Sequence, residues 1–447
     1  MSALPTADDR ARRRELADLL ERARRRTLAL VAPLDDETVH GQHVDFMSPL
    51  VWDVGHVGNF EELWLVRRLT GRPADDPARD ELYNPFEQPR WVRGELPLPP
   101  REETLAYLTE VRAEVLEVLH GLELDPSDPL LADGFVHLML AGHESQHQET
   151  MLQALGLRDD LDGYTPAGVG DDRRPAREVD DTERVLVPGG PTTIGTDARA
   201  WTYDNERPTH VVDVATFAID RFPVTCRRWA AFVDDGGYRR PELWSARGRA
   251  WLEDEGHVAP QGWLPDARGG WLLRRFGRVA PLDPREPVQH VSFFEAEAFA
   301  TWAGARLPTE HEWERAARFD PARPLEPRTF PWGDAQPSEE RANVGLRHLG
   351  PQPVGSYPAG ASALGVEQLA GDVYEWTTSS FEGYPGFEAF PYPEYSEVFF
   401  GGDYRVLRGS SWAIGVPFAR ATYRNWDHPY RRQLMAGVRL AHDVAGG

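Results

Sequence analysis

The stretch AGHESQHQETM, residues 141–151, places His143 and His147 four positions apart. In a helix this spacing puts both side chains on one face, one turn apart, where two imidazoles can share a metal ion. The same stretch fits the H-E-x-x-H pattern of zinc proteases, in which Glu144 would act as the general base. A pair of hydrogen-bonded structural histidines explains the spacing equally well. A third ligand is therefore needed to support a metal site.

A third histidine with suitable surroundings lies in SPLVWDVGHVGNFEELW, residues 48–64. One buried face of a helix here is expected to carry Trp52, His56, Phe60 and Leu63. An imidazole buried on such an apolar face needs a polar partner, and a metal ion would provide one. His40 and His43 rank lower, because they lie in a polar connection where histidines are ordinarily solvated. We therefore predict that His56 joins the pair as the third ligand.

The sequence after His147, QETMLQALGLRDD, lacks the glycine and histidine of the extended metzincin pattern. A glutamate ligand from a following helix is also hard to place, because the chain soon enters a linker. Three imidazoles leave several coordination positions open, as oxygen-activating iron enzymes require. The spacing fits zinc as well as iron, so the metal stays open at this point.

Length and composition indicate a folded protein with more than one domain. A chain of 447 residues exceeds one ordinary core, so two domains are expected. Hydrophobic residues make up 41% and there are 15 tryptophans, which excludes a disordered chain. The formal net charge of −23 argues against nucleic acid or an anionic membrane as the main partner.

The chain has a single cysteine, Cys226, so metal ligands must come from histidines and carboxylates. The N-terminal MSALPTADDRARRREL carries charges where a signal peptide needs an apolar core. Nowhere do about 18 uncharged apolar residues run together, as a membrane-spanning helix requires. We expect a cytoplasmic protein that does not enter a membrane.

Apolar periodicity predicts four amphipathic helices, near residues 8–31, 48–71, 100–123 and 127–156. Ser48 is expected to cap the second helix, with Pro49 at its first helical position. Four such helices suggest a bundle.

Residues 159–183 are rich in Gly, Pro and Asp and predict a linker or an interdomain crossing. Beyond them, short alternating stretches such as THVVDVATFAID predict strands. Two short helices are expected where capping boxes occur, at Ser292 with Glu295 and at Thr309 with Glu312.

The pairing of WDVGHVGNFEELW with HESQHQETM resembles the DinB-like four-helix domain, in which three histidines bind a metal. The second half is similar to the formylglycine-generating-enzyme family, whose fold is C-type-lectin-like. Its hallmarks here include VPGGPTTIGTD, PVQHVSFFEAEAFATWAGARLPTEHEWERAAR, LAGDVYEWTTS and YRVLRGSSW. The resemblance implies an α+β chain with a DinB-like four-helix bundle in residues 1–165 and a formylglycine-generating-enzyme-like, C-type-lectin-like domain in residues 184–447.

Three positions depart from the second family's pattern: Ser410 replaces the usual Gly, and Asp372 and Tyr374 stand where Asn and Trp are commoner. We expect them to belong to the scaffold. Formylglycine-generating enzymes use cysteines near the C-terminus, and none follows Cys226 here, so that activity is not expected.

The order of the two matches in one chain resembles the sulfoxide synthases of ergothioneine biosynthesis. The resemblance implies a non-haem Fe(II) enzyme that uses O2 to join the sulfur of γ-glutamylcysteine to the imidazole C2 of hercynine, giving a sulfoxide. Its iron ligands would be His56, His143 and His147.

The resemblance also assigns substrate residues. Arg90 and Arg93 would bind the carboxylates of γ-glutamylcysteine, since fixed guanidinium groups suit such anions. The further substrate-binding residues would be Gln146, Asn425, Trp426 and Asp427. A phenol can donate a proton during the reaction, and Tyr392 is favoured over Tyr384, with Tyr395 nearby.

Two other classes of function remain open from the sequence. One is a zinc-dependent hydrolase or thiol transferase that uses the H-E-x-x-H-like site and needs no oxygen. The other is a non-catalytic lectin-like binding module that carries a vestigial bundle and would tolerate loss of the histidines.

Overall fold

The computed structural model describes residues 7–170, 173–198, 202–324 and 326–444. They form two compact units. Unit 1 ends at Gly168, and unit 2 comprises Val169–Ala198 and the residues from Thr202 onward. Among the described residues, no helix has the length and apolar character needed to cross a membrane.

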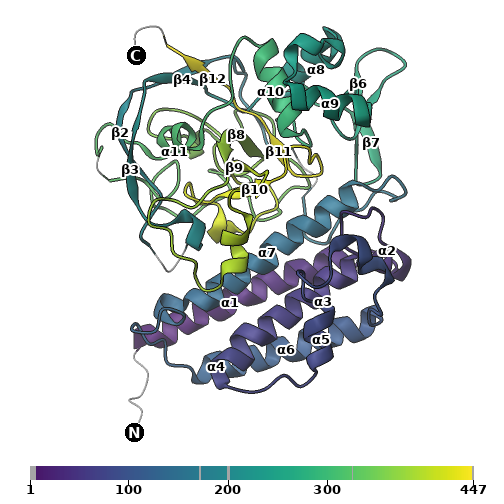
Figure 1. The fold of residues 1–447 in the computed structure, drawn as a ribbon, viewed down its shortest axis with the longest axis vertical. Coiled ribbons are helices and arrows are strands. Elements are labelled where there is room, and N and C mark those ends of the chain that lie inside the picture. Colours follow the sequence, from purple (N-terminus) through teal and green to yellow (C-terminus); the bar gives the residue numbers. More distant parts are fainter. Residues whose placement is uncertain (1–6, 171–172, 199–201, 325, 445–447) are drawn as a thin grey trace. The chain divides into compact units, whose positions relative to one another are not determined.

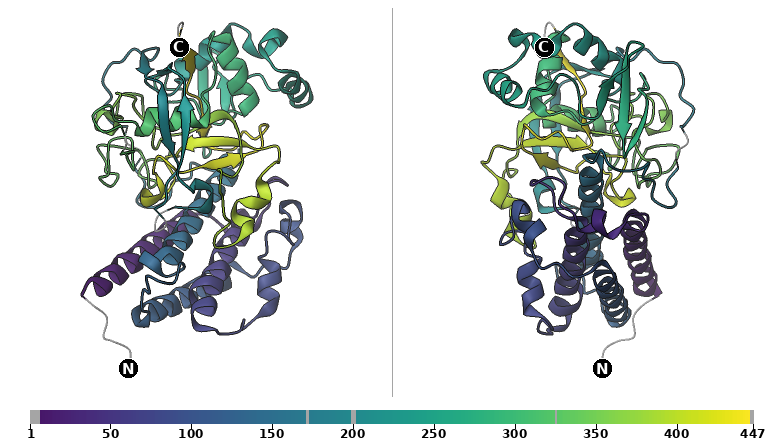
Figure 2. Two further views of the ribbon diagram at one scale, coloured as in Figure 1. Left: turned by 60° about the vertical axis from the view of Figure 1, so that its left-hand side comes forward. Right: turned by 90° about the vertical axis from the view of Figure 1, so that its right-hand side faces the viewer.

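Unit 1 is a four-helix bundle, as predicted (Figure 1; further views in Figure 2). Its long helices are α1 (Ala7–Val31), α3 (Leu50–Glu61), α6 (Arg101–Gly121) and α7 (Phe135–Gly156). Helix α1 packs against α7, and α3 packs against both α6 and α7. Helix α3 continues through a π-helical segment into α4 (Arg68–Thr70). The connections contain α2 (Asp36–His40), α5 (Pro77–Leu82) and the 3-10 turns Arg90–Glu95 and Ala132–Gly134.

Two predicted helix starts are wrong. Helix α7 begins at Phe135 rather than near residue 127, because Asp133 and Gly134 have φ angles of 54° and 75°, which a right-handed helix cannot accommodate. Helix α3 begins at Leu50, and its N-cap is Pro49 without a side-chain cap. The Ser48 hydroxyl instead accepts a hydrogen bond from Arg93 Nη1 at 2.8 Å.

The prediction of a single buried face on the second helix is also wrong for Leu63, which is 39% exposed. After Glu61 the helix continues as a π-helical segment, Glu62–Arg67. Its i→i+5 hydrogen bonds change the number of residues per turn, so the apolar positions leave the face they would occupy in an α-helix. Residues 51–59 are buried on all sides.

The interior of the bundle contains a closed ring of ion pairs with one member from each long helix. Arg24 of α1 donates to Glu144 of α7 at 2.9 Å and to Glu61 of α3 at 2.5 Å. Arg112 of α6 donates to Glu61 at 2.7 Å and to Glu144 at 3.2 Å. All four side chains are buried, and their charges cancel. Buried charges are tolerated when each is paired and hydrogen-bonded in this way.

The described residues of unit 2 form four small sheets, which supports the predicted α+β class. The first joins β1 (Arg184–Val187), β4 (Phe217–Asp220) and β12 (Ala441–Asp443). The second has the order β10 (Asn425–Asp427), β9 (Arg405–Gly409), β8 (Tyr374–Ser380) and β11 (Ala436–Gly437). The remaining strands are β2 (Gly190–Ile194) with β3 (His210–Val214), and β5 (Trp263–Pro265), β6 (Trp271–Arg275) and β7 (Arg278–Pro281).

Both predicted capping boxes are present. They start α10 (Phe293–Trp302) and α11 (Glu310–Arg318). The described part of unit 2 also contains α8 (Cys226–Asp234) and α9 (Ala246–Glu255), which were not predicted. These helices have only a Thr225 or Ser245 cap, without the glutamate that completes a capping box.

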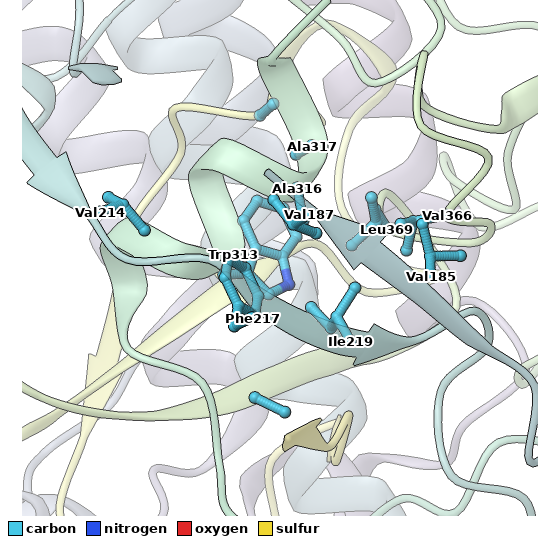
Figure 3. Close-up of a cluster of buried hydrophobic side chains, with 12 residues drawn as sticks. Val185, Val187, Val214, Phe217, Ile219, Trp313, Ala316, Ala317, Val366 and Leu369 are labelled. Atoms are coloured by element: carbon cyan, nitrogen blue, oxygen red, sulfur yellow. The ribbon is translucent and has the colours of Figure 1, made fainter. Parts of the chain in front are cut away.

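One hydrophobic cluster of unit 2 lies between α11 and the first sheet. Figure 3 shows Trp313 of α11 beside Phe217 and Ile219 of β4. The indole N–H of Trp313 donates to Glu375 of β8 at 2.6 Å, so the same side chain also ties the second sheet to this core.

The positions that depart from the family pattern lie in this scaffold. Asp372, Tyr374 and Ser410 are buried. Asp372 accepts hydrogen bonds from Gln352 N and Asn343 Nδ2, each at 2.8 Å, and Ser410 Oγ accepts from Gly371 N.

The segment after Gly168 is attached to unit 2. Arg173 pairs with Asp283 at 2.7 Å and Arg177 pairs with Glu367. A segment poor in large apolar residues is thus held by ion pairs.

The ring of ion pairs generates a stability prediction. Replacing Glu144 with Ala leaves Arg24 and Arg112 with uncompensated buried charge, so the free energy of unfolding of unit 1 should fall by about 3 to 5 kcal/mol. Urea denaturation followed by circular dichroism at 222 nm measures the change. The matched control is Glu110→Ala on the exposed face of α6, which should change stability by no more than about 0.5 kcal/mol. Equal stability of the two variants would contradict the role given to the ring.

Candidate metal centre

The fold brings together the three histidines that the sequence singled out. His56 comes from α3, and His143 and His147 come from α7. One ring nitrogen from each lies within 4.8 Å of the others. The Nε2 atoms of His56 and His143 are 3.2 Å apart. Three nitrogen donors therefore surround a common point inside the bundle.

Hydrogen bonds to the outer ring nitrogens fix the orientation of two of these imidazoles. His56 Nδ1 lies 2.8 Å from the carbonyl oxygen of Tyr83, and His147 Nδ1 lies 2.9 Å from Asp53 Oδ1. A carbonyl or a carboxylate can only accept, so the proton of each neutral ring must lie on Nδ1. In both rings Nε2 therefore carries the lone pair that can bind a metal.

Burial favours the neutral form of His56 and His143, which is the form that can bind a metal. Burial is the main cause that lowers the pKa of His56 and of His143, and the nearby His147 lowers both further. Aromatic rings form the walls: Trp52 stacks on His56 at 4.9 Å between centroids, and Phe60 lies 4.3 Å from His143. Three imidazole nitrogens beside aromatic rings suit a divalent transition metal.

Sequence reasoning missed Asp53 and Tyr83. Asp53 lies one turn before His56 on α3 and is only 1% exposed. A carboxylate within an otherwise apolar helix face was the available signal, since a buried acid needs a partner. The contribution of Tyr83 is a backbone carbonyl, which no side-chain pattern reveals.

Glu144 does not have the role that a zinc protease would give it. Its carboxylate accepts hydrogen bonds from Arg24, Arg112 and Thr27, the last at 2.7 Å. Burial alone would raise the pKa of Glu144, but the two arginines outweigh it and lower the pKa. A carboxylate engaged in this way cannot serve as a general base, so the structure argues against the protease alternative.

Arg90 and Arg93 lie on a 3-10 turn and differ in their surroundings. Arg93 is 5% exposed, and its guanidinium lies 3.5 Å from the centre of the Trp52 ring. It donates to Ser48 Oγ and to the Gln88 carbonyl, each at 2.8 Å. Arg90 is half-buried and donates to a backbone carbonyl. Because Trp52 also stacks on His56, Arg93 is connected to the histidine cluster through one shared ring.

Gln146 is half-buried on α7, next to His147.

Burial is the main cause that lowers the pKa of Arg93, to about 10, so its guanidinium stays charged at neutral pH.

In unit 2, three of the predicted residues form one aromatic cluster. The Tyr395 ring lies edge-on to Tyr392 at 6.3 Å and to Trp426 at 5.9 Å. Trp426 stacks on Phe381 at 4.1 Å. The remaining two predicted residues flank Trp426 on β10: Asn425 and Asp427 are half-buried, and each accepts a hydrogen bond from the backbone N–H of the following residue.

Tyr384 is set apart from this cluster. It is 5% exposed, Arg424 lies 4.2 Å from its ring centre, and its hydroxyl lies 3.5 Å from Glu310. Burial raises the pKa of Tyr384. These contacts place Tyr384 among the buried ionic groups of unit 2.

The hydrogen bond from His147 to Asp53 predicts the strength of metal binding. Asp53→Asn should weaken binding of a divalent ion about 10- to 100-fold, because an amide no longer fixes the Nδ1 proton as a carboxylate does. His56→Ala should weaken binding further, since it removes a ligand. Anaerobic calorimetry with Fe²⁺ and with Co²⁺ gives the affinities.

The control is His40→Ala. His40 lies near two backbone carbonyls, those of Asp36 and Pro99, so its loss should leave the affinity unchanged. Wild-type affinity in Asp53→Asn would contradict the assigned orientation of His147.

The sequence matches two family models. Residues 19–151 match the DinB superfamily, and residues 171–444 match the sulfatase-modifying factor enzyme 1-like domain. Three curated relatives are each named hercynine oxygenase. The protein of Mycolicibacterium smegmatis is 51% identical over 97% of this chain and 99% of its own length. Those of Mycolicibacterium thermoresistibile and Mycobacterium tuberculosis are each 50% identical, over 97% and 96% of this chain and 95% and 99% of their own lengths.

Proposed function

The chain belongs to the hercynine oxygenase family, and we propose on this basis that it joins hercynine to a thiol with dioxygen as a step of ergothioneine biosynthesis. The finer assignments are γ-glutamylcysteine as the thiol, Fe(II) as the metal and a sulfoxide as the product. The observation that carries the proposal is the three-imidazole cluster within a match that spans nearly the whole chain.

The reaction balances without a further co-reactant. The imidazole C2–H and the thiol S–H bonds break, and a C–S and an S–O bond form. One oxygen atom enters the sulfoxide and the other leaves as water, so dioxygen accepts all four electrons. Iron held by His56, His143 and His147 would supply the one-electron chemistry that dioxygen needs to react with such substrates.

The residues of unit 1 would hold the thiol substrate. The fork of Arg93 is already oriented by its bonds to Ser48 and Gln88 through Nη1 and Nε. Nη2 is then the donor for a substrate carboxylate, and Arg90 would bind the other carboxylate. Gln146, beside His147, would contact hercynine.

Residues of unit 2 would bind the charged groups of both substrates. Asp427 would pair with the ammonium of the thiol substrate, and Asn425 would bind the hercynine carboxylate. A trimethylammonium group has no N–H donors, so the face of Trp426 is its proposed contact. Tyr392 would deliver a proton to the oxygen that leaves as water, with Tyr395 packed against it.

We place the enzyme in the cytoplasm. A free thiol substrate and a metal of low oxidation state both require reducing surroundings, and the single Cys226 is consistent with them.

Anaerobic reconstitution tests the proposal. The protein is loaded with Fe(II) and then mixed with air, hercynine and γ-glutamylcysteine, and mass spectrometry follows the sulfoxide adduct. We expect product with iron, none with zinc, and none from His56→Ala. Turnover with zinc in the absence of oxygen would favour the hydrolase or thiol transferase, and binding without turnover would favour the lectin-like module.

Arg90 gives a second test, which concerns substrate choice. Arg90→Ala should raise KM for γ-glutamylcysteine by about 10- to 100-fold, the loss expected for a charge-assisted bond to a carboxylate. KM for hercynine should stay nearly constant. With cysteine, which has one carboxylate fewer, the effect should be smaller. Equal increases in both KM values would contradict the assignment of this arginine to the thiol.

A further inference from the structure

A short turn in unit 2, Asp204–Glu206, connects the two segments that carry the proposed chemistry of this unit. We name residues 390–396, which include Tyr392 and Tyr395, the tyrosine segment. Residues 420–427, which end in strand β10, are the β10 segment. The side chains of Asp204, Asn205 and Glu206 are 1%, 0% and 0% exposed. None of the three was identified from the sequence.

Asp204 holds both ends of the tyrosine segment. Its Oδ1 accepts a hydrogen bond from Ser396 Oγ at 2.5 Å, and its Oδ2 accepts one from Phe390 N at 3.2 Å. Asn205 Nδ2 also donates to Ser396 Oγ at 3.2 Å. One buried carboxylate therefore fixes the two points between which Tyr392 lies.

Glu206 and Asn205 hold the β10 segment. Glu206 accepts from Arg420 Nε at 2.7 Å and from Thr422 Oγ1 at 2.6 Å. The Asn205 carbonyl accepts from Arg424 Nη1 at 2.7 Å. The side chains of Asp204 and Asn205 thus contact the tyrosine segment, whereas the side chain of Glu206 and the backbone of Asn205 contact the β10 segment. A mutation of Asp204 can therefore be separated from the contacts of the β10 segment.

Aromatic contacts reinforce the connection. Tyr203, directly before the turn, stacks on Tyr395 with 4.3 Å between centroids. Arg420 lies 5.6 Å from the centre of the Tyr203 ring. Tyr395 in turn meets Trp426 edge-on.

Burying the charged carboxylate of Asp204 costs free energy, which a purely structural anchor would not need to spend. Glu206 pairs directly with Arg420, whereas the hydrogen bonds that Asp204 accepts from Ser396 and Phe390 come from neutral donors, and the nearby charge of Arg207 only partly offsets the effect of burial. Burial raises the pKa of Asp204, which reflects the cost of the charged form. What the carboxylate provides is two acceptor oxygens in a fixed relation, one for each end of a segment that has only a single 3-10 turn.

We propose that Asp204 is a positioning residue for Tyr392 and thereby determines how the reaction divides between two products. This inference rests on the proposed function. Formation of the sulfoxide releases one oxygen atom as water and needs a proton from Tyr392. Oxidation of the thiol alone places both atoms of dioxygen on sulfur, giving a sulfinate, and needs no such donor. A displaced Tyr392 should therefore favour the sulfinate.

The test compares Asp204→Asn and Ser396→Ala with Tyr392→Phe as the reference. The asparagine keeps the shape but offers one acceptor oxygen in place of two. Each of the first two variants should raise the sulfinate-to-sulfoxide ratio about fivefold, as expected for one lost hydrogen bond. Tyr392→Phe should raise it more. KM for both substrates should change little, because the β10 segment keeps its contacts with Glu206.

The matched control is Asp220→Asn. Asp220 is equally buried in unit 2 and bonds to Arg228 at 2.6 Å and His442 at 2.8 Å, outside both segments. It should lower the melting temperature without changing the product ratio. If the role of Asp204 were only structural, Asp204→Asn would also lower the melting temperature and leave the product ratio unchanged.

A second measurement does not depend on activity. Hydrogen exchange of peptides covering residues 388–400 should speed up in Asp204→Asn and Ser396→Ala but not in Asp220→Asn. Unchanged exchange, or an unchanged product ratio while Tyr392→Phe shifts it, would overturn the inference and leave the proposed function intact. Absence of sulfoxide from the iron-loaded wild type would overturn both.

Discussion

The candidate metal centre depends on where two protons lie. His56 and His147 can present lone pairs to a common point only because their Nδ1 protons are directed outward, to the Tyr83 carbonyl and to Asp53. The burial that lowers the pKa values of His56 and His143 keeps the rings neutral. These contacts require α3 and α7 to remain in register. The ring of ion pairs between Arg24, Glu61, Arg112 and Glu144 links these two helices to α1 and α6.

The histidines and the glutamate of the H-E-x-x-H pattern therefore have separate surroundings in this chain. The histidines share one helix face, while Glu144 projects from another face toward Arg24 and Arg112. The pattern alone fits a protease base equally well. Two arginines on α1 and α6 distinguish the two roles of Glu144, because they pair with its carboxylate. They lie far from Glu144 in the sequence, so no local spacing reveals them.

The sequence predicted best what is determined locally. Helical periodicity gave the four long helices, and the capping boxes at Ser292 and Thr309 gave the starts of α10 and α11. Features that depend on backbone geometry were missed, such as the left-handed Asp133 and Gly134, the π-helical segment after Glu61 and the Tyr83 carbonyl. Asp204 was missed because its partners, Phe390 and Ser396, lie far along the chain.

The two units position their residues by different means. In unit 1 the three candidate ligands stand on helices whose backbone hydrogen bonds are satisfied internally, so the geometry of the cluster follows from helix packing. In unit 2 Tyr392 and Tyr395 stand on a segment with little regular structure, and its backbone and side chains must find polar partners elsewhere. Buried carboxylates such as Asp204 supply those partners. Substitutions in the polar interior of unit 2 should therefore shift Tyr392 and Tyr395 by removing the polar partners of their segment. In unit 1 the three histidines should instead shift when the packing of α3 against α7 changes.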